Sequence, residues 1–292
     1  MKTPHRLRSA RLLVLSVIAT SLALPVAIGQ ETPEKKPSSK EALKNSKTVS
    51  SGENMIRPNP YDKFIALDSA LGAEAIKWKE VMNRTEVNID PDTVKDTKVA
   101  IPALLGFRIC DGVMAIKARD AEKLNACADH IEKLGKKLGV TDADLRRAKM
   151  VRSFATRGEW GRVFLELGYL QQDIEAVLQR ESGVSGKAPV RKILYAAGWL
   201  QGARYTSSLV RDHYSERTGG LLREPLLVKE LKADLDGAGL PNTGIVKLLS
   251  EAMTELEKLV NVELRKSLSK DSVEAMAKLT AQTVVACVKE AK

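Results

Sequence analysis

The chain has 292 residues, with 47 Lys and Arg against 37 Asp and Glu, and 43% of its residues are hydrophobic but only 4% are aromatic. This apolar content is enough to bury a core, which excludes a wholly disordered or collagen-like chain. The low aromatic content, together with abundant Ala, Leu, Lys and Glu, disfavours a β-sandwich or barrel. The three cysteines are too few for a disulfide-dense mini-scaffold.

Residues 1–29 have the pattern of a secretory signal peptide. Four cations precede an uncharged apolar run over 12–24, which is too short for a comfortable membrane span. The small residues Ala27 and Gly29 predict cleavage after Gly29, so we expect a periplasmic or secreted protein with no integral membrane segment after cleavage. An uncleaved N-terminal anchor is the alternative interpretation.

Removal of the four cations of the signal peptide from a net charge of +10 leaves a mature charge of +6. This mild excess favours anionic surfaces only weakly, and we expect no nucleic-acid partner. Residues 30–60 are rich in Lys, Glu, Ser, Pro and Asn and have no sustained apolar period. Such a segment buries too little surface to offset its ordering entropy, so it is interpreted as a disordered linker.

From residue 61 onward, apolar residues recur at helical spacing, and no useful length of strand alternation is found. The pattern predicts one all-α domain over 61–292, an array or bundle of about eight to nine helices. The expected helices span 61–82, 99–118, 120–138, 141–157, 159–181, 189–214, 221–236, 243–267 and 272–291. Asp120, Asn242 and Asp271 are the expected N-caps, and Gly139 and Gly158 are expected to end helices.

The two halves of this domain, 101–181 and 189–291, share an internal echo. Gly106-Phe107 precedes Arg119-Asp120 at the same spacing as Gly198-Trp199 precedes Arg211-Asp212. The echo suggests two pseudo-repeated four-helix halves that share a core, although the identity is slight enough for chance to produce it.

The 99–118 segment is apolar nearly all round, which predicts a buried helix. Arg108 and Asp111 lie three residues apart on one face of it, and buried charges are costly unless they are paired. They form either an internal ion pair that serves the fold or a ligand-gripping arginine oriented by a carboxylate.

The 189–214 helix is the expected counterpart of the 99–118 helix. Gly198 and Gly202 predict close packing there, against a neighbouring helix or a ligand. Its polar and aromatic side chains line either a pocket or the core. The candidate ligand-binding residues from both helices are Arg108, Asp111, Trp199, Arg204 and Tyr205, with Tyr195 and Gln201 beside them.

Cys110 and Cys127 are equally far from the expected turn between residues 118 and 119. In an oxidising compartment this register predicts a disulfide, with buried free thiols as the alternative. A metal site at Cys110, Cys127 and His130 lacks a fourth protein ligand, so no metal is expected.

No catalytic or cofactor motif is found in the sequence, so catalytic residues stay unassigned and no cofactor is expected. The favoured interpretation is an exported helical binding or interaction protein of a bacterial cell envelope, with a protein or a small anionic ligand as its partner. One alternative is an envelope enzyme that uses Arg108, Asp111, Arg204 and His213 in a polar cleft, and another is a structural scaffold. The oligomeric state is left open.

Overall fold

The computed structural model describes residues 60–72, 75–96, 98–181 and 189–292, so the predicted signal peptide and almost all of the predicted linker lie outside the described residues. Within the described ranges every regular element is an α-helix, which confirms the all-α prediction. No helix among these residues is long and apolar enough to cross a membrane. The helices are α2 (Pro60–Leu71), α3 (Ala75–Arg84), α4 (Ala100–Ala118), α5 (Ala121–Lys137), α6 (Arg146–Thr156), α7 (Trp160–Glu181), α8 (Pro189–Asp212), α9 (Glu216–Leu221), α10 (Pro225–Asp236), α11 (Gly244–Val260) and α12 (Lys270–Glu290).

Several helix ends follow the local sequence as predicted. The side chain of Asp120 accepts a hydrogen bond from the backbone N–H of Lys123 at 3.1 Å and caps α5. Gly139 and Gly158 follow α5 and α6 with φ of 82° and 70°, a left-handed conformation that glycine adopts at little cost. The expected helix over 221–236, in contrast, starts later, at Pro225, where the missing N–H of proline leaves no intrahelical bond unmade.

The expected helix over 61–82 is wrong, because the structure divides it into α2 and α3. Gly72 has a φ of 54° and ends α2. The two helices then fold back on each other, with the rings of Phe64 and Trp78 in an edge-to-face contact at 5.2 Å. A glycine inside a periodic pattern is compatible with a helix, so the sequence pattern alone missed this break.

The expected helix over 243–267 is also too long, since α11 ends at Val260. Residues 261–269 leave the helical path, and distant side chains bind the carbonyl groups of two of them. Arg223 donates to the carbonyl oxygen of Val262 at 3.0 Å, and the hydroxyl of Tyr214 donates to that of Leu268 at 3.0 Å.

The structure also corrects two predicted N-caps and the predicted start of one helix. The N-cap of α11 is Thr243 rather than Asn242. The N-cap of α12 is Ser269 rather than Asp271, and the Ser269 side chain accepts from the backbone N–H of Ser272. The expected helix over 141–157 starts later, at Arg146. A short helix, α9, precedes α10 and was not predicted.

The centre of the core is the pair of helices α4 and α8. Every residue of α4 except Arg108 and Lys117 is buried, and α8 is buried over nearly all of 193–210. The helices approach so closely at Gly106 that a Cβ there would lie 2.3 Å from the carbonyl oxygen of Leu194 and 2.9 Å from the backbone nitrogen of Gly198. Glycine at this crossing is therefore required by the contact of the two backbones.

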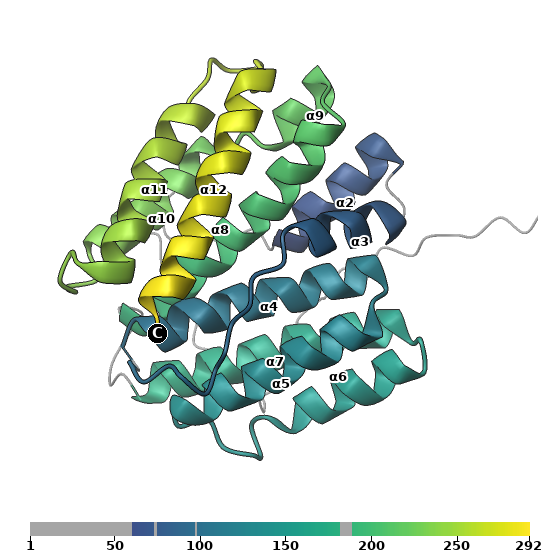
Figure 1. Ribbon diagram of the computed structural model, residues 1–292, viewed down its shortest axis with the longest axis vertical. Coiled ribbons are helices and arrows are strands. Elements are labelled where there is room, and N and C mark those ends of the chain that lie inside the picture. The colour runs from purple at the N-terminus through teal and green to yellow at the C-terminus, as the bar shows by residue number, and fades with distance from the viewer. Residues whose placement is uncertain (1–59, 73–74, 97, 182–188) are drawn as a thin grey trace, which may run out of the picture. The chain divides into compact units, whose positions relative to one another are not determined.

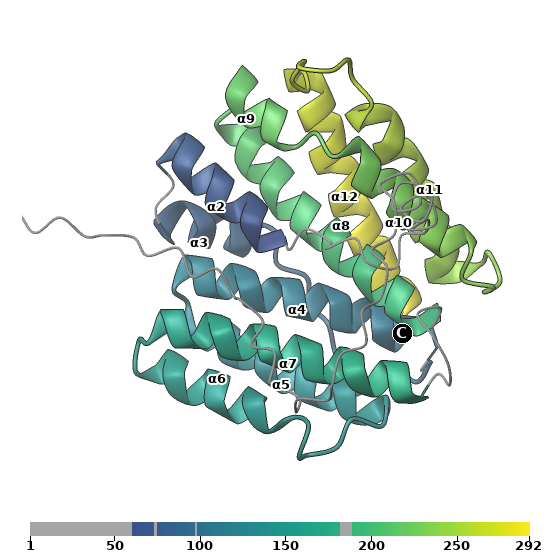
Figure 2. The same ribbon diagram turned by 180° about the vertical axis from the view of Figure 1, so that it is seen from behind.

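The remaining helices pack around this pair in two groups (Figures 1 and 2). In one group α4 packs on α5 and α7, while α6 packs on both α5 and α7. In the other group α8 packs on α10 and α12, while α11 packs on both α10 and α12. Helices α2 and α3 contact α8, and α3 also contacts α4, so these two N-terminal helices lie beside the crossing.

Candidate functional site

The candidate site is centred on the carboxylate of Asp111, on the face of α4 that meets α8. Asp111 is only 5% exposed. Its Oδ2 accepts from Nη1 of Arg108 at 2.9 Å, one turn earlier on the same helix. Its Oδ1 accepts from Nε2 of Gln201 at 2.6 Å and from the hydroxyl of Tyr205 at 2.7 Å. The predicted ion pair is thus formed, and α8 supplies two further donors to it.

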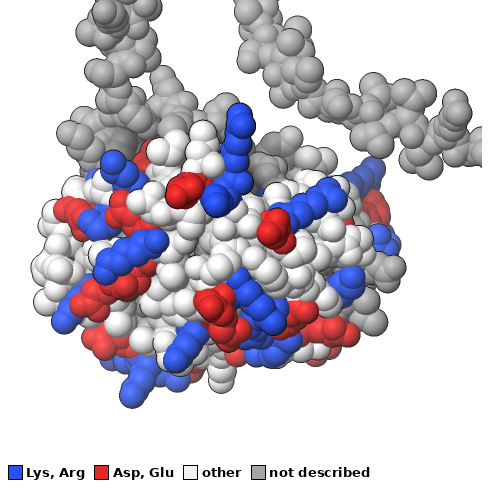
Figure 3. Space-filling view, turned by 90° about the horizontal axis from the view of Figure 1, so that it is seen from above, with Lys and Arg blue, Asp and Glu red and all other residues white. Residues whose placement is uncertain are grey.

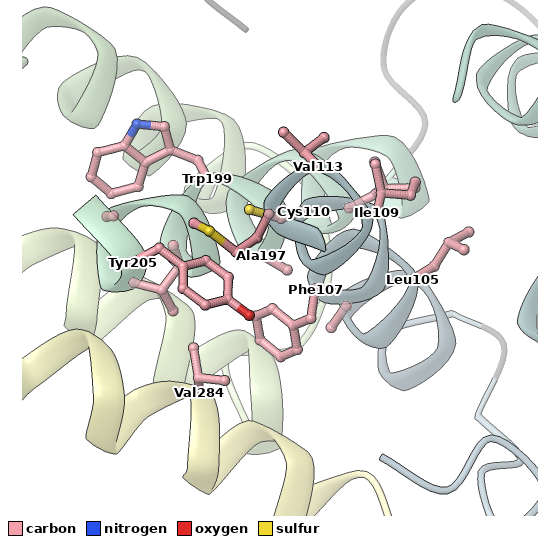
Figure 4. Packing of buried hydrophobic residues seen from close by; sticks show 14 of the residues in the cluster. Leu105, Phe107, Ile109, Cys110, Val113, Ala197, Trp199, Tyr205 and Val284 are labelled. Atoms are coloured by element: carbon pink, nitrogen blue, oxygen red, sulfur yellow. The ribbon is translucent and has the colours of Figure 1, made fainter. Parts of the chain in front are cut away.

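The packing around this network is apolar. In Figure 4 the ring of Tyr205 lies beside the ring of Phe107, and Val284 of α12 points toward them. Burial raises the pKa of the Tyr205 hydroxyl well above its usual range, and the neighbouring Asp111 carboxylate acts in the same direction. Tyr205 therefore stays protonated and serves Asp111 as a hydrogen-bond donor.

A cavity of about 210 Å³ opens beside this network. The end of α3, the α3–α4 connection, α4, α5 and Tyr205 of α8 form its wall. Its lining residues are Met82, Glu86, Val87, Asn88, Arg108, Asp111, Lys123, Ala126, Cys127, His130 and Tyr205.

Two buried nitrogen atoms in residues that line the cavity have no hydrogen-bond partner in the structure, Nε of Arg108 and Nδ1 of His130. The other Arg108 nitrogens are engaged, because Nη1 bonds Asp111 and Nη2 donates to the carbonyl oxygen of Val87 at 3.5 Å. Burial lowers the pKa of His130 below its ordinary 6.5, and the positive charge of Arg108 lowers it further. The imidazole is therefore neutral at pH 7.

The opposite edge of the cavity carries a second ion pair. Nζ of Lys123 lies 2.8 Å from Oε2 of Glu86. The Lys123 side chain is 21% exposed and that of Glu86 is 65% exposed, so this pair lies toward solvent. Such pairs contribute little to stability, and either partner can exchange a contact for a ligand at low cost.

Arg204 is a second buried guanidinium close to the network. It is only 5% exposed, and neither its Nε nor its Nη1 has a hydrogen-bond partner in the structure. Burial lowers its pKa, while Tyr205 and the Asp111 carboxylate act in the opposite direction. Arg204 does not belong to the lining of the cavity. The interior thus holds two arginines around one carboxylate.

Cys110 and Cys127 are buried free thiols in the structure, so the disulfide between them stays a prediction. Burial raises the pKa of both thiols, which disfavours the reactive thiolate. Among the residues that the structure describes, no three His, Cys, Asp or Glu side chains are placed to hold a metal ion, and this includes Cys110, Cys127 and His130.

The structure brings together only part of the residue set predicted from sequence. Arg108, Asp111 and Tyr205 meet at the cavity, whereas Arg204 does not line it. Trp199 points elsewhere, because its indole nitrogen donates to Glu224 at 3.2 Å and its ring lies under the ammonium group of Lys63.

His213 is exposed at the end of α8 and lines no part of the cavity. Sequence reasoning also missed Glu86 and Lys123, which look like ordinary surface charges until the α3–α4 connection folds over α5. His130 was considered only as a metal ligand. Its position three residues after Cys127 on the same helix face was the available signal.

Outside the site, the surface charges are mixed in sign. On the face shown in Figure 3, Lys and Arg alternate with Asp and Glu over the described surface. The basic residues of α6 follow this pattern. Arg147 pairs with Glu166 and Asp173, and Arg152 pairs with Asp129 and Glu132.

No family model, curated protein or solved structure matches the chain.

Proposed function

We propose that this protein is a small-molecule binding protein whose ligand occupies the cavity beside Asp111. The observation that carries this proposal is a cavity of about 210 Å³ whose lining includes five charged or titratable side chains, those of Glu86, Arg108, Asp111, Lys123 and His130. Convergent polar groups in a pre-formed hollow are typical of binding sites.

A rigid wall supports the same proposal. Asp111 is held by donors from α4 and α8, and this fixes the orientation of Arg108 before any ligand arrives. Pre-organisation of this kind lowers the entropic cost of binding. A scaffold role alone does not account for a hollow lined by charged groups beside the buried Asp111 network.

The alternative of an enzyme has weaker support from the same residues. The candidate nucleophile in the lining is the thiol of Cys127, and burial raises its pKa, opposite to the shift that activates a cysteine. The hydroxyl of Tyr205 donates to Asp111, and burial raises the pKa of that hydroxyl, which disfavours a phenolate that could act as a general base. Binding without chemistry therefore fits the cavity better.

We further propose that the protein acts in the cell envelope after export. The support is the cationic, apolar and small-residue pattern of residues 1–29. N-terminal sequencing of the protein recovered from envelope or culture fractions should return Gln30. Recovery of Met1 from these fractions would contradict cleavage.

We also propose that 101–181 and 189–291 are two copies of one four-helix unit. The helices of both groups contact each other in the same order, α4–α5–α6–α7 and α8–α10–α11–α12. Gly106 and Gly198, which are equivalent in the sequence echo, face each other where α4 and α8 cross. The cavity then lies between the first unit and residues 82–88, with Tyr205 contributed by the second unit.

The binding proposal is tested by identifying what co-purifies with the mature protein. Ala126 lines the cavity and is exposed, so Ala126→Phe should obstruct the hollow without touching the Asp111 network. Ala176→Phe is the matched control, since Ala176 is an exposed alanine of α7 away from the cavity. Mass spectrometry of small molecules released on denaturation should find the same compound with the wild type and with Ala176→Phe, but not with Ala126→Phe. The same set of compounds with all three folded proteins would refute the proposal.

A further inference from the structure

We infer that the outer face of α7 binds a second copy of this protein in an antiparallel, two-fold arrangement. This surface is separate from the cavity, and its role does not depend on what the cavity binds. Helix α7 packs on α4, α6 and α8, and it lies side by side with α6 in Figure 2. The outer face of α7 consists of its exposed positions from 161 to 176, which are Gly161, Arg162, Leu165, Tyr169, Gln172 and Ala176.

The outer face of α7 carries almost no charge. Arg162 is the one charged residue among its six positions. The exposed positions of α11, by contrast, are all charged and are Lys247, Glu251, Glu255 and Lys258. A helix that presents one side to water normally carries charged and polar residues there, as α11 does. The outer face of α7 therefore has the composition of a contact surface.

This face also exposes large apolar side chains. Leu165 is 56% exposed and Tyr169, one turn later, is 45% exposed. The guanidinium of Arg147 on α6 lies 4.7 Å from the ring of Tyr169, so the next turn of α6, with Met150, lies beside Leu165. Three of the seven exposed large hydrophobic side chains among the described residues thus gather here. A contiguous exposed apolar patch marks an interaction site.

The charges around this patch indicate a second copy as the partner. Two ion-pair clusters of opposite net charge flank it, a basic cluster at the start of α7 and an acidic cluster beyond Leu165. Their members are Arg157, Arg162 and Glu159 in the basic cluster, and Glu166, Asp173 and Arg147 in the acidic cluster. Two arginines share one carboxylate in the first cluster, whereas two carboxylates share one arginine in the second.

An antiparallel pair of α7 helices places the basic cluster of each copy against the acidic cluster of the other. With the two-fold axis beside Leu165, Arg157 of one copy lies level with Asp173 of the other, because both are eight residues from the axis. In the same register Tyr169 lies over Gly161 of the other copy, where a Cβ would meet nothing within 4 Å of its own chain. A two-fold contact requires a surface that complements itself in this way. A parallel pair would instead bring like charges together.

Sedimentation velocity of the mature protein tests the association. We expect monomer at about 1 µM and dimer at about 300 µM, because one helix face from each copy makes a small interface with a micromolar Kd. Leu165→Glu should weaken the dimer by at least about tenfold, since it places two like charges together at the axis. Leu226→Glu is the matched control, because Leu226 on α10 is 77% exposed and lies outside this face. It should leave the dimer Kd unchanged.

Charge reversal tests the antiparallel register. Arg157→Glu should raise the dimer Kd by about fivefold, because each dimer contains the contact with Asp173 twice. The double variant Arg157→Glu/Asp173→Arg should restore the Kd of the wild type, since the two charges are exchanged. Far-UV circular dichroism of each variant checks that the fold is kept.

Cysteine cross-linking tests the axis directly. Leu165→Cys should form a disulfide between two copies when diamide oxidises the paired thiols, because position 165 meets its own copy at the axis. Gln172→Cys should not, since its two copies would lie about 20 Å apart along the helices. The native cysteines are buried in the structure, so the wild type is the background control.

Several results would overturn the inference. The second copy is refuted as the partner if the protein stays monomeric at about 300 µM. The outer face of α7 is refuted if Leu165→Glu dimerises like the wild type, or if Leu226→Glu weakens the dimer equally. The antiparallel register is refuted if the double charge reversal binds no better than Arg157→Glu, or if Gln172→Cys cross-links as readily as Leu165→Cys.

Discussion

Removal of Asp111 should destabilise the protein more than removal of its partner Arg108. Asp111→Leu breaks three hydrogen bonds and leaves the Arg108 guanidinium, the Gln201 amide and the Tyr205 hydroxyl without their shared acceptor. Loss of one partner of a buried ion pair costs about 3–5 kcal/mol. Arg108→Leu also strands a charge, that of Asp111, but it leaves this carboxylate two of its three donors, so its cost should lie toward the lower end of that range.

The double variant Arg108→Leu/Asp111→Leu measures the coupling of the pair. It should lose less stability than the sum of the single variants, by about 0.5–3 kcal/mol, because neither charge is left stranded. Asp111→Asn is the matched comparison, since its side-chain oxygen still accepts from Gln201 and Tyr205 while the negative charge is gone. It should fall between the wild type and Asp111→Leu.

Urea unfolding of the mature protein, followed by far-UV circular dichroism, gives these free energies of unfolding as long as the slope is shared by all variants. Equal losses for Asp111→Leu and Arg108→Leu would refute the reasoning that Asp111 is the shared acceptor. Losses below about 0.5 kcal/mol for both would show that the pair is solvated. In that case the buried site derived above would be wrong as well.

Three further predictions concern the crossing, the imidazole and the linker. Gly106→Ala should destabilise the protein by about 1–3 kcal/mol in the same urea assay, because the new Cβ meets the carbonyl oxygen of Leu194. Gly168→Ala on α7 is the control. Its Cβ meets nothing within 4 Å, so it should stabilise the protein by about 0.5–1 kcal/mol. Burial and the charges of Arg108 and Lys133 lower the pKa of His130 below 6.5, while Asp129 and Asp111 oppose that shift. As the pH falls, the unfolded chain therefore binds a proton at this histidine before the folded protein does. The melting temperature should then fall as the pH drops below 6.5. His130→Gln should reduce that fall, and an unchanged pH profile would contradict a buried neutral imidazole. Deletion of residues 30–59 should change the melting temperature by less than about 2–4 °C, since this segment has little apolar surface to bury, and a larger drop in calorimetry would mean that it packs on the domain.

The sequence by itself determined the helical class, the buried character of α4 and the pairing of Arg108 with Asp111. These are local properties, because the apolar period, the cap at Asp120 and the spacing of three residues on one helix face all lie within a few turns of chain. The glycine at which α2 ends, Gly72, is visible in the sequence. A single glycine can either end a helix or be tolerated inside one, so the sequence pattern did not predict the break.

Only the tertiary structure decided which residues meet at the site. Gln201 and Tyr205 reach Asp111 across 90 or more residues of chain, and this depends on where α8 crosses α4. The same crossing turns Trp199 away toward Glu224, although it is only two residues from Gln201. The α3–α4 connection and α5 then place Glu86, Lys123 and His130 around one hollow. Helical periodicity says which residues share a face, but the neighbour that each face meets is fixed by packing between distant helices.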